Sequence, residues 1–103
     1  MTKEELKKTL AAHPTEDDVW DALCQLQNQT FRTTKGLEYT YTIKGYEMFV
    51  NRKEKSITRS SVDIAFRKAL ELGRIVTGPK KLGVFGASYL YPIFLEMGIA
   101  RKS

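Results

Sequence analysis

The chain has 103 residues, and its 17 Lys and Arg outnumber its 12 Asp and Glu, which gives a formal net charge of +5 and an isoelectric point near 9.4. With 42% hydrophobic and 28% charged residues, the composition predicts one small folded domain and excludes a collagen-like, disordered or low-complexity chain. One cysteine and one histidine exclude a disulfide framework and a zinc finger.

A short helix is predicted at the N-terminus. Thr2 and Glu5 have the spacing of a capping box, in which each side chain bonds a backbone N–H at the start of the helix. The helix runs to about Ala12, because the proline of His13-Pro14 disfavours a helical conformation in the residue before it. Acidic residues at positions 4 and 5 and the lack of an apolar run argue against a signal peptide, so we expect a cytoplasmic protein.

A second helix is predicted from Thr15, where residues 15–18 repeat the capping pattern. Acidic side chains in its first turns complement the positive end of the helix dipole. We expect the helix to end near Gln29. Its apolar stripe comprises Val19, Leu23 and Leu26, with Trp20 and Cys24 beside it.

The period of hydrophobic residues changes to two in residues 38–51, which predicts a β-hairpin with Lys44-Gly45 as its two-residue loop. This loop opposes Ile43 to Tyr46 and Tyr41 to Met48. The face expected to be buried comprises Tyr39, Tyr41, Ile43, Tyr46, Met48 and Val50. The other face carries Thr40, Thr42, Glu47 and Phe49.

A third, basic helix is predicted to begin after Thr58, a typical N-cap residue, and to end at Gly73. Its apolar stripe comprises Val62, Ala65, Phe66, Ala69 and Leu72. Residues 74–77 have the composition of a short third strand that would add to the hairpin.

The C-terminal segment 82–100 contains one charged residue, Glu96, and therefore raises the question of a membrane span. Several glycines, a serine and Pro92 interrupt the segment, which argues against a span. We expect a glycine-rich turn followed by a helix over residues 88–97 that ends at Gly98, with Pro92 tolerated near its first turn. The face expected to be buried comprises Leu90, Ile93, Phe94 and Met97.

Together these elements predict a single α+β domain over residues 1–103: two N-terminal helices, an antiparallel hairpin with an optional third strand, a basic amphipathic helix and an apolar C-terminal helix. A standard winged helix is not indicated, because its wing follows the recognition helix, whereas this hairpin precedes the basic helix. A variant of the winged-helix arrangement stays open.

The sequence offers few candidate catalytic residues, so we expect a protein that is not an enzyme and has no metal or cofactor. His13 lies in a predicted loop with no visible partner, which favours a solvated residue. Cys24 lies on the apolar side of its helix, which favours a buried, inert thiol.

The charge is unevenly distributed. Residues 51–81 hold nine positive and three negative side chains, a net of +6, whereas residues 1–50 hold six positive and eight negative, a net of −2. A concentrated positive charge is typical of a surface that binds phosphate, although many basic domains simply have a solvated face.

The start of the basic helix is the expected centre of this surface, because free N–H groups, hydroxyls and Arg59 meet there. The alternative is that Thr58 and Ser61 only cap the helix. The sequence therefore favours nucleic-acid binding, with duplex DNA as the expected partner. The predicted contact residues are Arg52, Lys53, Thr58, Arg59, Ser60, Lys80 and Lys81.

A rival hypothesis is a protein-interaction or self-associating module that forms a homodimer through the apolar C-terminal helix. Tyr89, Tyr91 and Leu95 fall off the main stripe of that helix, so we expect part of its apolar area to be exposed.

Overall fold

The computed structural model describes residues 3–52 and 55–102, apart from the side chains of Lys3, Leu6 and Lys7. These residues contain four α-helices, a short 3-10 helix and two small antiparallel sheets. The predicted α+β class is therefore confirmed. Thr2 and Lys53 lie outside the described residues. The elements in chain order are α1 (Lys3–Ala11), α2 (Glu16–Leu26), β1 (Phe31–Arg32), β2 (Glu38–Tyr39), β3 (Tyr41–Lys44), β4 (Glu47–Val50), β5 (Ile57–Thr58), α3 (Arg59–Glu71), η1 (Pro79–Leu82) and α4 (Ala87–Met97).

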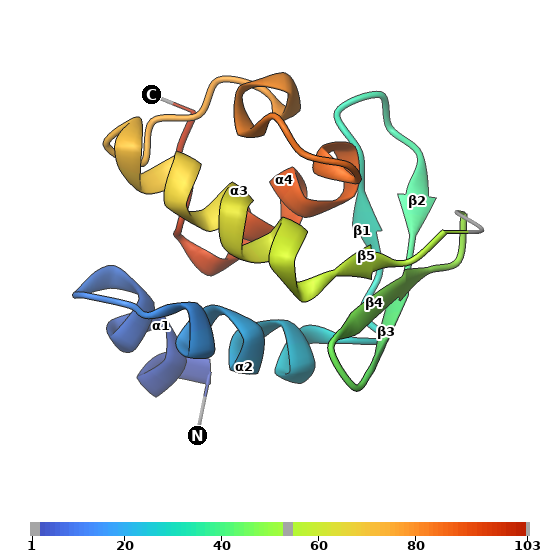
Figure 1. The fold of residues 1–103 in the computed structure, drawn as a ribbon, viewed down its shortest axis with the longest axis horizontal. Coiled ribbons are helices and arrows are strands. Elements are labelled where there is room, and N and C mark those ends of the chain that lie inside the picture. Colours follow the sequence, from blue (N-terminus) through green and yellow to red (C-terminus); the bar gives the residue numbers. More distant parts are fainter. Residues whose placement is uncertain (1–2, 53–54, 103) are drawn as a thin grey trace.

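The helices lie on one side of the molecule and both sheets lie on the other (Figure 1). In this view α1 and α2 run beneath α3, and α4 lies behind α3. Strand β5 leads directly into α3, so the three-stranded sheet β3-β4-β5 is continuous with the central helix. The hairpin precedes the basic helix in the chain, as predicted, and a variant winged-helix arrangement stays a prediction.

Helix α2 begins at the predicted capping box. The Thr15 hydroxyl accepts a hydrogen bond from the Asp18 N–H at 3.2 Å, and the Asp18 carboxylate accepts one from the Thr15 N–H at 2.8 Å. The helix ends at Leu26, three residues before the predicted end, because Gln27 leaves the helical conformation with ψ of 152°. The Gln27 side chain accepts from the Ile43 N–H and thereby joins the end of α2 to β3.

The hairpin β3-β4 differs from the prediction in register. Its loop is Gly45-Tyr46, because Lys44 pairs with Glu47 and Tyr41 pairs with Val50. Glycine occupies the first loop position with φ of +59°, as a type II′ turn requires, whereas the sequence analysis placed it second. The shift is two residues, which changes every pair but leaves the side chains of the paired strand residues on their predicted faces.

The predicted faces of the hairpin are therefore confirmed for most residues. Buried on the inner face are Tyr39, Tyr41, Met48 and Val50, with Ile43 half-buried. Thr42 and Glu47 are exposed on the other face. Tyr46 was expected on the buried face but lies in the loop with 69% of its surface exposed, because the turn displaces it from the strand. Tyr39 belongs to a separate strand, β2, which pairs with β1.

The third strand of the larger sheet is β5, where Met48 pairs with Ile57, and the prediction of a strand over residues 74–77 beside the hairpin was wrong. Gly73 and Arg74 both adopt left-handed conformations, with φ of +65° and +69°, and reverse the chain after α3. Ile75 then forms a single parallel bridge with Arg101 near the C-terminus, which belongs to neither sheet.

Helix α4 is confirmed with Gly98 as its left-handed cap, and the four residues predicted to be buried are buried. Pro92 is the sixth residue of the helix, beyond the first turn in which it was expected. Tyr91 was expected to lie off the buried stripe, but it is only 1% exposed, and its hydroxyl donates to the Val76 carbonyl at 2.6 Å. Among the described residues, no helix has the length and hydrophobicity that crossing a bilayer would require.

Tyrosine hydroxyls connect parts of the core that are distant in sequence. Three buried tyrosines each donate to a backbone carbonyl: Tyr39 to Tyr89 at 2.5 Å, Tyr41 to Leu23 at 2.7 Å, and Tyr91 to Val76 at 2.6 Å. These bonds join β2 to α4, β3 to α2, and α4 to the segment after α3. Each ring contributes apolar area to the core while its hydroxyl satisfies a carbonyl, which is the favoured way to bury tyrosine.

Candidate nucleic-acid interface

Arg59, the residue expected at the centre of a phosphate-binding surface, is held by side chains of other elements. Its guanidinium donates to the Asp17 carboxylate of α2. It also lies over the rings of Trp20, 5.6 Å from the centroid, and Tyr46, 5.3 Å from the centroid. The Arg59 side chain is 23% exposed, so a phosphate at this point would compete with Asp17 for the same donor.

A second ion pair joins the same two helices. The Nε atom of Arg67 donates to Glu16 at 3.2 Å, and Arg59 and Arg67 are eight residues apart, about two helical turns, so both face α2. The sequence analysis explained the acids of α2 by the helix dipole and missed these pairs. The signal was present as two acids at the start of one helix and two arginines on one face of another.

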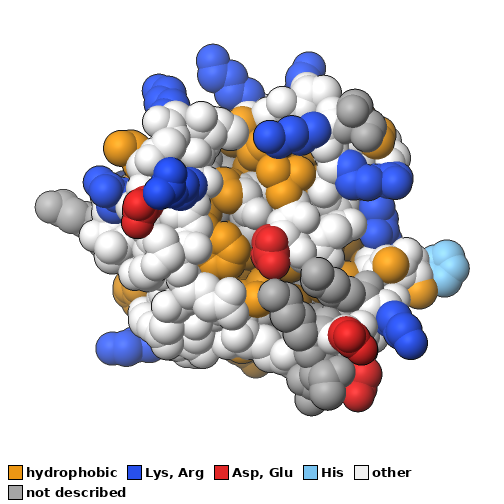
Figure 2. Space-filling view, turned by 180° about the vertical axis from the view of Figure 1, so that it is seen from behind, with side chains coloured by type: hydrophobic (Ala, Val, Ile, Leu, Met, Phe, Trp, Pro, Cys, Tyr) orange, Lys and Arg blue, Asp and Glu red, His pale blue; other side chains and the backbone are white. Residues whose placement is uncertain are grey.

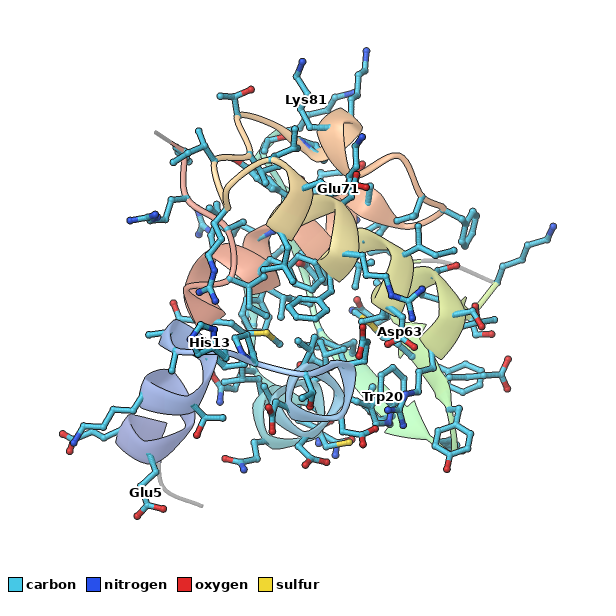
Figure 3. All side chains as sticks on the ribbon, turned by 60° about the vertical axis from the view of Figure 1, so that its left-hand side comes forward. Glu5, His13, Trp20, Asp63, Glu71 and Lys81 are labelled. Atoms are coloured by element: carbon cyan, nitrogen blue, oxygen red, sulfur yellow. The ribbon has the colours of Figure 1, made fainter. Side chains whose placement is uncertain are left out.

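Asp63 lies in this charged region of α3, near Trp20 (Figure 3). Its Oδ1 atom is buried with no hydrogen-bond partner among the described residues. Burial raises the pKa of the Asp63 carboxyl, although the charges of Arg59 and Arg67 act in the opposite direction. Burial therefore has the largest effect on this carboxyl and disfavours its charged form.

The hydroxyls at the start of α3 serve the helix. The Thr58 hydroxyl accepts from the Ser61 N–H at 3.3 Å, which confirms Thr58 as the N-cap, and Ser60 is exposed. Arg52 is exposed after β4, and its Nε atom donates to the Glu38 carbonyl. Ser60 takes no part in the cap, and both Ser60 and Arg52 are exposed.

Lys80 and Lys81 lie at a different place, on η1 at the edge of a cleft of about 790 Å³. One wall of this lysine cleft is the turn 33–37 between β1 and β2, which contributes Lys35, and the other wall comes from residues 77–89. In Figure 2, which shows the molecule from behind, hydrophobic side chains lie in a hollow in the upper half of the view, with Lys and Arg side chains around it. Neither wall contains an acidic residue.

The three lysines of the cleft, like Lys8, Lys44 and Lys102, form no ion pair with a carboxylate among the described residues. Arg32, Arg59, Arg67 and Lys68 each form an ion pair with a carboxylate of the chain. Lys35, Lys80 and Lys81 are exposed, and no carboxylate of the described residues lies within ion-pair distance of them. Their charges are therefore available to an external anion.

The predicted contact residues do not gather at one point. Figure 3 shows Trp20, the stacking partner of Arg59, at one end of the molecule and Lys81 near the other. The structure instead brings Lys80 and Lys81 together with Lys35, which the sequence analysis did not select. A single lysine in an unrecognised turn carried no sequence signal, because strands β1 and β2 are too short to show a period.

The remaining chemical groups are isolated. Cys24 is half-buried rather than fully buried, and its pKa is raised mainly by burial and further by Asp21, which keeps the thiol protonated at neutral pH. His13 is exposed. Within the described residues, no three His, Cys, Asp or Glu side chains are grouped as metal ligands.

The chain was compared with models of protein families, with curated proteins and with solved structures, and none of the three comparisons found a match.

Proposed function

We propose that this protein is a non-enzymatic nucleic-acid-binding domain that contacts phosphates through the lysine cleft. The observation that carries the proposal is the grouping of Lys35, Lys80 and Lys81 around one cleft without a carboxylate in its walls. The last two belong to the set expected from the sequence, and Lys35 extends it.

The charge balance supports this placement. Residues 77–89 contain two lysines and no acid, and the opposite wall adds a third lysine. Adjacent cations that lack internal partners repel one another, and a phosphate chain relieves that repulsion while it releases its own condensed counterions. Hydroxyls of Thr34, Thr77 and Ser88 line the same cleft and offer further donors to phosphate oxygens.

Arg59 and Ser60 lie at the start of α3, and Arg52 lies after β4 beside Glu38, so a long nucleic acid could reach these residues outside the cleft. Arg59 contributes there only if it leaves Asp17, so we expect its substitution by alanine to affect stability more than binding. The surrounding positive charge attracts a polyanion without a specific contact. The lysine cleft is therefore the part of the surface on which binding depends most.

The rival hypothesis of an interaction module rested on an exposed apolar face of α4. In the structure this helix directs Leu90, Tyr91, Ile93, Phe94 and Met97 into the core. Tyr89 and Leu95 are half-buried and pack against the same core, so most of the apolar area of α4 is used in folding. A homodimer stays a prediction that sedimentation velocity would test.

Fluorescence anisotropy with labelled oligonucleotides at increasing salt tests the proposal. A variant with Lys35, Lys80 and Lys81 changed to Gln removes the cleft charges, and a control with the exposed Lys8, Lys44 and Lys102 changed to Gln removes the same charge elsewhere. We expect the cleft variant alone to bind much more weakly, and the slope of log K against log salt to fall by about two units for three lost contacts to single-stranded nucleic acid.

Two outcomes would contradict the proposal. The first is that the wild-type protein binds no single-stranded or duplex probe at low salt. The second is that both variants lose the same affinity, because binding would then follow net charge and not the cleft.

A further inference from the structure

The lysine cleft has an apolar side as well as a basic one. Leu37, which is 47% exposed, lies in the turn 33–37, and Val84 and Tyr89 belong to the opposite wall. These side chains share the cleft with the three lysines. A site that only received a phosphate would need donors and positive charge, and it would gain nothing from an apolar wall.

The turn 33–37 is a fixed wall. The Thr33 N–H donates to the Leu37 carbonyl at 2.9 Å, and the Leu37 N–H donates to the Thr33 hydroxyl at 3.1 Å. Thr33 is buried, and Gly36 adopts φ of +85°, which allows the tight reversal that places Lys35 and Leu37 on the cleft. A preorganised wall loses little entropy when a ligand binds.

The opposite wall is also held in place. The Tyr39 hydroxyl donates to the Tyr89 carbonyl at 2.5 Å, and the two rings meet edge to face with centroids 5.0 Å apart. At Gly86, a Cβ atom would lie 2.4 Å from the side chain of Ile57, so the wall packs against β5 as closely as glycine permits. Both walls are therefore held in place by contacts within the protein.

The size and chemistry of the cleft define a class of ligand. Its volume of about 790 Å³ lies within the range of sites that enclose a small molecule. Three lysines without an acid select an anion, and the apolar side selects a ligand that carries a flat or aliphatic part beside its charge. A nucleotide unit combines a phosphate and a base in this way.

We propose that the lysine cleft binds one unpaired nucleotide, with its phosphate against the lysines and its base against Leu37 and Val84. This inference rests on the proposed function and refines it. A duplex keeps its bases stacked inside and presents only phosphates to a cleft, whereas a single strand can turn one base into it. The protein accordingly prefers single strands, which departs from the duplex partner expected from the sequence.

The test compares a labelled oligothymidylate with a blunt duplex of the same length in fluorescence anisotropy at one low salt concentration. We expect the single strand to bind at least about tenfold more tightly, because a base contact adds to the phosphate contacts. Leu37→Ser should remove most of this preference and leave duplex binding unchanged. Leu70→Ser, which changes a leucine that is 41% exposed on α3 and outside the cleft, is the matched control and should keep the preference.

Failure of this inference is distinct from failure of the proposed function. Equal affinity for both probes, with binding still lost in the triple Lys→Gln cleft variant, overturns the nucleotide site and leaves phosphate binding intact. Absence of binding to either probe overturns both. Competition with thymidine monophosphate identifies the source of the ligand: displacement as efficient as by the oligonucleotide overturns strand binding and assigns the cleft to a free nucleotide.

Discussion

Tyr41→Phe should destabilise the protein, because the Tyr41 hydroxyl forms a buried hydrogen bond that joins β3 to α2. It donates to the Leu23 carbonyl at 2.7 Å, and the two residues are 1% and 0% exposed. Phenylalanine retains the ring and its packing, so the change isolates the hydroxyl. The loss comprises one hydrogen bond and the partial desolvation of a buried carbonyl, which together cost about 1 to 2 kcal/mol.

Urea denaturation followed by circular dichroism measures this loss. For an m value of about 1.5 kcal/mol/M, a loss of that size lowers the midpoint by roughly 1 M urea. Tyr46→Phe is the matched control, because Tyr46 is 69% exposed. Its free energy of unfolding should change by less than about 0.5 kcal/mol. Tyr41→Ala removes the ring as well and should cost about 3 to 5 kcal/mol.

The reasoning fails if Tyr41→Phe has the stability of the wild type while the fold is intact. It also fails if Tyr46→Phe is destabilised as much, because the effect would then follow from the loss of any tyrosine hydroxyl. Nuclear magnetic resonance spectra of both variants would show whether the native packing is kept.

Three further outcomes are expected. Burial raises the pKa of Tyr39 and Tyr41 above the usual value of about 10, so these two groups should leave stability unchanged below that pH and lower it as the pH rises above it, with tyrosinate absorbance appearing together with unfolding. Gly86→Ala should cost about 1 to 3 kcal/mol in thermal denaturation, because its Cβ would meet β5, whereas Gly36→Ala has a similar φ but open space and should cost less. Burial raises the pKa of Asp63, so ionisation of this carboxyl lowers the stability of the wild type as the pH rises. The stability of Asp63→Asn relative to the wild type should therefore increase from acid to neutral pH, and a variant less stable than the wild type at neutral pH would refute this.

Elements that depend on neighbouring residues could be predicted from the sequence. The capping box of Thr15 and Asp18 and the N-cap at Thr58 involve hydrogen bonds within three residues, so the local pattern specifies them. The buried face of the hairpin was also predictable, because a period of two survives even a register shift of two residues. The α+β class follows from the order of these elements.

Features that depend on distant contacts needed the tertiary structure. The alternation of apolar and polar residues fits two registers of the hairpin, one with Lys44-Gly45 and one with Gly45-Tyr46 as the loop. The structure selects Gly45-Tyr46. Arg59 is paired with Asp17, 42 positions away, and no local pattern shows that these side chains meet. The candidate site changed for the same reason: Lys35 joins Lys80 and Lys81 only because the turn after β1 packs beside η1 and the start of α4. Sequence thus determined the local elements and the excess of positive charge, whereas folding decided which charges are neutralised within the chain and which remain free to bind a ligand.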